Sequence, residues 1–153
     1  MGTISDLEGG LGIHLQRPAA DLFDGTTTSV FTVTGGRVFI MALSMETSVG
    51  AADGANAVKF VGNPTVGTSI DLCATLDVDT DEIGTVYSIT GTLSDALDGT
   101  VAGGVASMAK PIIVNEGTID ISSGGDSNNT NSALQTVDLF YIPLDQNASV
   151  AVA

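Results

Sequence analysis

Apolar and polar residues alternate with a period of two through much of the chain, which is typical of strands with one buried face. The clearest case is 117–144, where Ile119 and Ile121 alternate with polar residues before a run rich in Gly, Asp, Asn and Ser. A second apolar stretch follows that run, so we expect the segment to form a long β-hairpin. Its second arm is apolar enough to be covered on both faces, by the core on one and by another subunit or arm on the other.

Further strands are expected at regular spacing along the chain. Residues 29–46 are predicted to form two strands around Gly35-Gly36, a dipeptide that supplies the positive φ angles of a two-residue hairpin. The other predicted strands are 57–61, 70–76, 85–90, 110–114 and 149–153. Residues 91–109 fit either a short helix or a loop, and their glycines favour the loop. This pattern predicts an all-β protein, an antiparallel β-sandwich or jelly roll, with 29–153 as one domain.

Residues 1–28 keep neither a helical nor a strand period, because three glycines and Pro18 interrupt them. The segment is nevertheless too rich in large apolar side chains for a disordered tail. We therefore expect an irregular N-terminal arm that packs along its own domain or reaches a neighbour. Its candidate interface residues are Leu11, Ile13, Leu15, Leu22 and Phe23.

The charge of the chain is strongly acidic, with 18 Asp and Glu against four Lys and Arg and a formal net charge of −14. Four scattered cations cannot neutralise a phosphate backbone, so no nucleic-acid partner is expected. An anionic membrane surface would repel such a protein, and no apolar run reaches the length of a membrane span. The N-terminus also lacks the pattern of a signal peptide, so we expect synthesis and folding in a cytoplasm.

Catalytic signatures are sparse, and we expect no enzyme and no cofactor. The single histidine, His14, lies in the irregular segment, and the single cysteine, Cys73, lies in a strand pattern that favours a core position. A nucleophilic triad or a zinc site would need more partners than these two residues supply.

One acidic turn has metal-binding character. Asp77, Asp79 and Asp81 alternate in LDVDTDEIG, and such residues can converge oxygen ligands on Ca²⁺. The segment is not an EF-hand, because Glu82 occupies the position that needs Gly. An irregular Ca²⁺ site and a solvated acidic turn therefore both remain open.

Several phrases in order resemble small structural proteins of tailed bacteriophages. They are FTVTGGRVFIMAL (31–43), TSIDLCATLDVDTDEIGTVYSITG (68–91), GTIDIS (117–122) and VDLFYIPLDQNASV (137–150). The group includes capsid decoration (cement) proteins, whose β-sandwich or jelly-roll domains commonly form trimers on the outer shell.

The resemblance implies a virion protein on the capsid exterior that binds the major capsid protein and itself, as a homotrimer. Phe140, Tyr141 and Ile142 are then further interface candidates, because aromatic and aliphatic anchors carry most of an interface's binding energy. Two alternatives remain open: another virion component of the tail, neck or fibre, and a non-catalytic β module that binds carbohydrate or Ca²⁺.

Overall fold

The computed structural model describes residues 12–49, 56–78, 83–100, 110–125 and 134–153. These residues contain β-strands and no helix. None of them therefore forms a helix with the length and hydropathy needed to cross a membrane. The strands are β1 (Ile13–Ala20), β2 (Thr27–Thr34), β3 (Val38–Val49), β4 (Asn56–Pro64), β5 (Ile70–Asp71), β6 (Leu76–Asp77), β7 (Val86–Ser88), β8 (Asp98–Thr100), β9 (Ile112–Val114), β10 (Gly117–Gly125), β11 (Leu134–Pro143) and β12 (Ser149–Val152).

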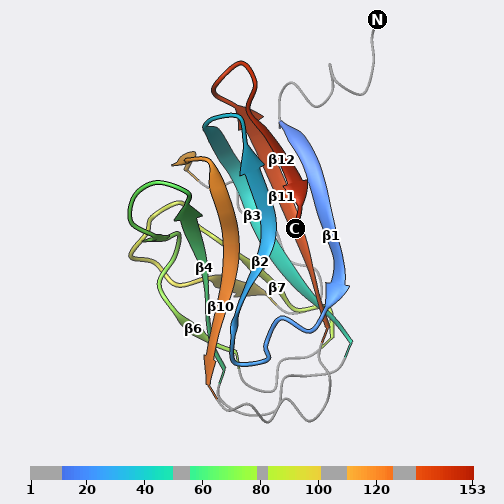
Figure 1. The fold of residues 1–153 in the computed structure, drawn as a ribbon. Coiled ribbons are helices and arrows are strands. Elements are labelled where there is room, and N and C mark those ends of the chain that lie inside the picture. Colours follow the sequence, from blue (N-terminus) through green and yellow to red (C-terminus); the bar gives the residue numbers. More distant parts are fainter. Residues whose placement is uncertain (1–11, 50–55, 79–82, 101–109, 126–133) are drawn as a thin grey trace, which may run out of the picture.

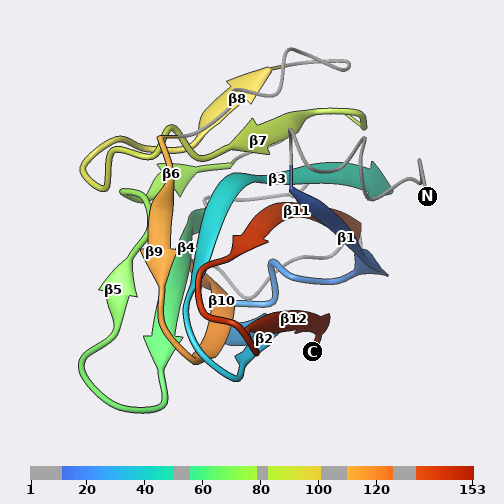
Figure 2. The same cartoon turned by 90° about the horizontal axis from the view of Figure 1, so that it is seen from above.

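The strands form two antiparallel sheets packed face to face, so the predicted β-sandwich is confirmed (Figure 1). Sheet A has the order β1-β11-β3-β7-β8, and β9 pairs with the other end of β3. Sheet B has the order β12-β2-β10-β4-β5, and β6 also pairs with β4. Figure 2 looks along the strands and shows β1, β11 and β3 in one layer and β12, β2 and β10 in the other.

The core lies between the sheets and is built by the alternation that the sequence shows. Along β11, Val137 and Leu139 are fully buried while their neighbours are half-buried. On β10, Ile119 and Ile121 are fully buried from the opposite sheet. Removing these side chains from water supplies the main driving force for packing the two layers.

The hairpin expected at 117–144 is wrong. β10 pairs with β2 and β4 in sheet B, whereas β11 pairs with β1 and β3 in sheet A. Both strands direct one apolar face into the same core, so their sequence pattern is the same whether they pair with each other or face each other. The periodicity could not distinguish the two arrangements. Phe140 and Ile142 on the outer face of β11 are half-buried within the chain, and the expected covering of this face by another subunit stays a prediction.

The hairpin expected around Gly35-Gly36 is likewise wrong, because β2 belongs to sheet B and β3 to sheet A. Both glycines do have positive φ, 74° and 136°. The dipeptide turns the chain at a corner between the sheets. A Cβ on Gly36 would lie 2.6 Å from the Cβ of Asp145, so the close packing of this corner requires glycine.

The irregular arm expected at 1–28 is wrong for residues 13–20, which form β1 along the edge of sheet A. Only one face of an edge strand needs apolar residues, and here Leu15 lies opposite Leu139. Ile13 and Leu15 alternate with His14 and Gln16, but Pro18 and the register shift after Arg17 end this alternation after four residues, so the strand period is easily missed in the sequence.

The other expected strands are found with changed lengths. The strand expected at 70–76 is reduced to β5 and β6, while β4, β7, β9 and β12 overlap their predicted positions. The segment SDALDG forms no helix: it starts in a turn, Ala96 makes an isolated bridge with Ala74, and Asp98 and Gly99 begin β8. The loop expected here is therefore confirmed only for its first residues, and a short strand follows that was not predicted.

Candidate interaction surface

The N-terminal interface candidates divide into buried and surface residues. Leu22 and Phe23 are 1% exposed and belong to the core, which corrects the expectation that they face a partner. The backbone N–H of Leu22 donates a 2.9 Å hydrogen bond to Oε1 of the buried Gln135, which fixes the chain where it leaves β1. Ile13 is 37% exposed and Leu15 is half-buried against the core, and an interface role for these two stays a prediction. Leu11 lies outside the described residues.

The three candidates on β11 divide by the alternation of the strand. Tyr141 is 4% exposed and points into the core, where its hydroxyl oxygen accepts a 3.3 Å hydrogen bond from the N–H of Val150. The expectation that Tyr141 faces a partner is therefore wrong. Phe140 and Ile142 point to the outer face of sheet A and are half-buried.

The outer face of sheet A carries a cross-strand row of apolar side chains that we call the outer patch. In register, Ile142 of β11 lies opposite Phe39 of β3, and Phe39 lies opposite Ile113 of β9. In a neighbouring row, Phe140 lies opposite His14 of β1. Ile113 is 50% exposed, and Phe39 is half-buried. The outer patch thus comprises His14, Phe39, Ile113, Phe140 and Ile142.

His14 is held in place by two contacts to β11. Its ring stacks on Phe140 with the centroids 4.6 Å apart, and its Nε2 lies 2.7 Å from Oδ1 of Asp138. The same carboxylate oxygen accepts a 3.1 Å hydrogen bond from Nε2 of Gln16. Cys73 takes no part in this cluster: it is buried, its Sγ accepts a hydrogen bond from the N–H of Phe60, and burial raises the pKa of its thiol. The His14 cluster thus fastens the edge strand and presents a flat aromatic surface.

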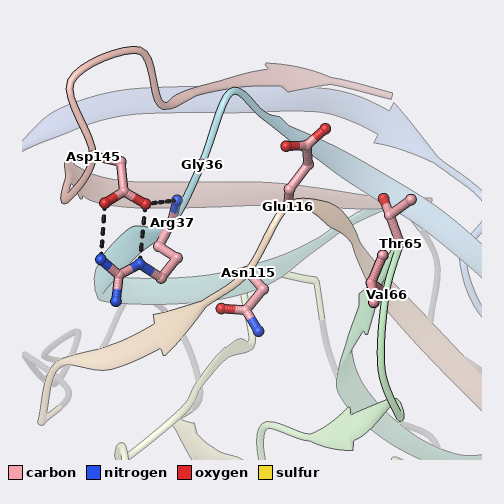
Figure 3. A pocket seen from close by; sticks show the side chains of 7 residues that line it. All are labelled: Gly36, Arg37, Thr65, Val66, Asn115, Glu116 and Asp145. Carbon is pink, nitrogen blue, oxygen red and sulfur yellow. Dashed lines mark hydrogen bonds and ion pairs between the residues drawn. The ribbon is translucent and has the colours of Figure 1, made fainter.

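A second feature is an open hollow of about 440 Å³ at one end of the sandwich, where four connections between strands meet. Figure 3 shows Arg37 and Asp145 facing each other on one side of it and Thr65 and Val66 on the other. The guanidinium of Arg37 donates from Nε and Nη2 to the Asp145 carboxylate at 3.0 and 2.8 Å, and the backbone N–H of Arg37 adds a third bond of 2.7 Å. These hydrogen bonds to Arg37 lower the pKa of Asp145 to about 2.

The hollow continues into a smaller one of about 210 Å³, and both are lined by Asn115. Val66 is 84% exposed at the first hollow, and Ile70 and Ile113 are 45% and 50% exposed at the second. We call the lining of the two hollows the loop-end surface. Through Ile113 it is continuous with the outer patch.

The acidic turn is described only at its beginning. Asp77 lies on β6 and is exposed, while Asp79 and Asp81 lie outside the described residues. Within the described part of the chain, no group of three or more His, Cys, Asp or Glu side chains could hold a metal ion. The Ca²⁺ site therefore stays a prediction.

Comparison with known proteins assigns no family. No protein-family model matches the chain, and no curated protein matches it. A solved structure of the infectious bursal disease virus Gx strain is similar at 14% identity over 92% of this chain and 34% of that chain, with a TM-score of 0.18. This chain thus spans about a third of the length of that chain, and a similarity this low carries no argument about function.

Four surface residues were not identified from the sequence: Phe39, Val66, Ile70 and Ile113. The alternation in VFIMAL and KPIIV predicts strands, but a strand flanked by apolar residues on both faces does not reveal which face is outside. For Val66 the signal was present, since a valine in a Gly- and Thr-rich turn has no strand period to bury it.

Proposed function

We propose that the protein is a structural virion component, a decoration protein that binds the major capsid protein on the outer surface of the shell. The observation that carries the proposal is the outer patch. Three strands place partly exposed apolar side chains in register on one face of the sandwich. Such a patch on a solvent-facing sheet is typical of a protein-binding surface. The phrases that resemble bacteriophage decoration proteins supply the kind of partner.

The outer patch has the composition of an interface centre. Phe140 and Phe39 supply aromatic area, and stacking against His14 holds the ring of Phe140 in place, so less side-chain entropy is lost on binding. Polar residues of β1 and β11, among them Gln16 and Asp138, border the patch as a rim.

The test is co-sedimentation of the full chain with expanded, undecorated capsids of the virus that encodes it. We expect Phe140→Ser and Ile142→Ser each to weaken capsid binding by about tenfold or more, since central anchors of an interface cost upwards of ~1–2 kcal/mol on truncation. The matched control is Val61→Ser, because Val61 is a half-buried side chain on the outer face of sheet B. Equal binding by all three variants and the unaltered chain would contradict the proposal.

The proposal includes a homotrimer, which the resemblance implies. Light scattering of the full chain gives its mass directly, and a stable trimer is the expected result. Removing residues 1–25 is not a clean test of arm contacts, because it would delete β1 and expose the edge of β11. A monomer both in solution and on capsids would refute the trimer.

A further inference from the structure

The loop-end surface gathers apolar side chains that the fold does not bury. The described residues contain seven exposed large hydrophobic side chains: Ile13, Val66, Ile70, Ile83, Leu93, Ile113 and Val152. Three of the seven, Val66, Ile70 and Ile113, line the two adjoining hollows. Single exposed apolar residues are ordinary, but a cluster around a concavity indicates a binding surface.

The shape of this surface suits protruding side chains of another protein. The smaller hollow, at about 210 Å³, is below the ~300–1,000 Å³ typical of small-molecule sites. The larger one is open to solvent and is lined by side chains from separate connections (Figure 3). The smaller hollow is too small and the larger one too open to enclose a drug-sized molecule, whereas side chains of a docked segment would fill both.

The charges at this end favour a cationic occupant. Arg37 is paired with Asp145, and Lys59 pairs at 2.8 Å with Asp71, which follows Ile70 on β5. Glu116, which lines the larger hollow, is exposed and has no ion pair within the described residues. The one uncompensated charge in the two linings is therefore negative.

The net charge of the whole chain has the same sign as this local charge and adds to its effect. A net charge of −14 attracts a basic partner over a distance of about a Debye length. A basic partner segment is therefore favoured over an acidic one at this surface.

The backbone around the hollows is fixed before any partner arrives. The N–H of Thr65 donates a 2.8 Å hydrogen bond to the carbonyl of Glu116, which ties the β4–β5 connection to the start of β10. Gly117 has a φ of 149°, and a Cβ there would collide with the backbone of Asn63. A preformed surface loses little conformational entropy on binding.

We infer that the loop-end surface binds a protein segment that presents a Lys or Arg side chain to Glu116 and apolar side chains to Val66, Ile70 and Ile113. The inference rests on the proposed function in that it takes the occupant to be a protein. It names a surface that shares only Ile113 with the outer patch, and it adds a charge contact at Glu116 that the outer patch does not have.

The test uses the isotope-labelled full chain and three short peptides, with binding followed by nuclear magnetic resonance. The peptides are acetyl-Leu-Lys-Leu-amide, its Leu-Glu-Leu counterpart and its Ser-Lys-Ser counterpart. We expect the Leu-Lys-Leu peptide to shift the amide signals of Val66, Ile113 and Asn115. It should bind about threefold more tightly than the Glu peptide at low salt, as expected for one exposed charge contact.

Protein variants provide the second arm of the test. Glu116→Gln should remove the preference for Lys over Glu, and Val66→Ser should weaken binding of the Leu-Lys-Leu peptide by several-fold. The matched controls are Glu46→Gln, on β3 nine residues beyond Arg37 and so ~30 Å away, and Ile83→Ser, beside the far end of β3 where Gly84 bonds to Thr47. Both controls should bind like the unaltered chain.

Several outcomes would overturn the inference. They are equal binding of the Lys and Glu peptides, equal binding of the Leu and Ser peptides, signal shifts away from the loop end, and no effect of Glu116→Gln. The titration contains no capsid, so its failure is separate from failure of the decoration proposal, which only the capsid experiment tests.

Discussion

The two outer faces of this sandwich differ although their inner faces are alike. Sheet A presents Phe39, Phe140 and Ile142 outward, with Phe39 and Ile142 in register, whereas the outer face of β10 in sheet B carries Thr118, Ser122 and the buried Asp120. Each sheet buries an apolar alternation of the same kind. The inner faces thus determine the fold, and the difference between the outer faces is the reason why the proposed binding surface is placed on sheet A.

The largest effect is expected when inward-facing side chains are shortened. The two sheets should then lose similar amounts of stability. We expect Leu139→Ala in sheet A and Ile121→Ala in sheet B each to lower the free energy of unfolding by about 2–5 kcal/mol, through lost burial and the cavity left behind. Both residues are 0% exposed. Urea denaturation measures the change in the free energy of unfolding. A loss for only one of the two variants would show that the two sheets contribute unequally to the stability of the core.

A smaller effect is expected at the corner that joins the two sheets. Gly36→Ala places a Cβ against Asp145 at a φ of 136°, and we expect a loss of about 1–3 kcal/mol from backbone strain and steric conflict. Gly124→Ala is the matched control, because its nearest neighbour would lie 3.9 Å away. Thermal unfolding of the two variants checks the prediction, and equal melting temperatures would contradict it.

The outer faces should matter less for stability than for binding. We expect Phe140→Ser to cost about 1 kcal/mol, mainly through the lost stacking on His14. Thr118→Ala, on the outer face of sheet B, should change stability by no more than about 0.5 kcal/mol. Denaturation curves of both variants measure this. A loss of several kcal/mol for Phe140→Ser would mean that the outer patch belongs to the core instead of a binding surface.

The smallest expected effect is the loss of stability at low pH when Asp145, the partner of Arg37, becomes protonated. The pKa of Asp145 is lowered from 3.8 to about 2, so the pair stabilises the fold fully above pH ~4 and loses that contribution as the pH falls through about 2. The gap in melting temperature between the unaltered chain and Asp145→Asn should therefore narrow between pH ~4 and ~2. Both side chains are exposed, so salt should also narrow the gap. A gap independent of pH would contradict the assignment.

Periodicity was sufficient to predict the fold class, because inward-facing residues such as Ile119, Ile121, Val137 and Leu139 recur at every second position. It could not predict which strands pair. β10 and β11 belong to opposite sheets and each buries one apolar face in the same core, so their pattern is the same as that of a hairpin.

The candidate site was predicted less completely than the fold. Phe140 and Ile142 were identified among the interface candidates, but Tyr141 between them points inward, as the same alternation requires. Phe39 and Ile113 join them only through register across three strands, which no local sequence feature encodes. The pairing of Arg37 with Asp145, 108 residues apart, is equally invisible in the sequence.

The pairing of β1 with β11 has a consequence for how the chain is made. Ile13 and Tyr141 are partners although they lie 128 positions apart in the sequence, and the β10–β2 and β3–β11 ladders are also non-local. Topologies of this kind fold in milliseconds to seconds, because long loops must close before their contacts form. On the ribosome, β1 therefore cannot pair until β11 has been synthesised. Until then its apolar side chains remain accessible to chaperones and proteases.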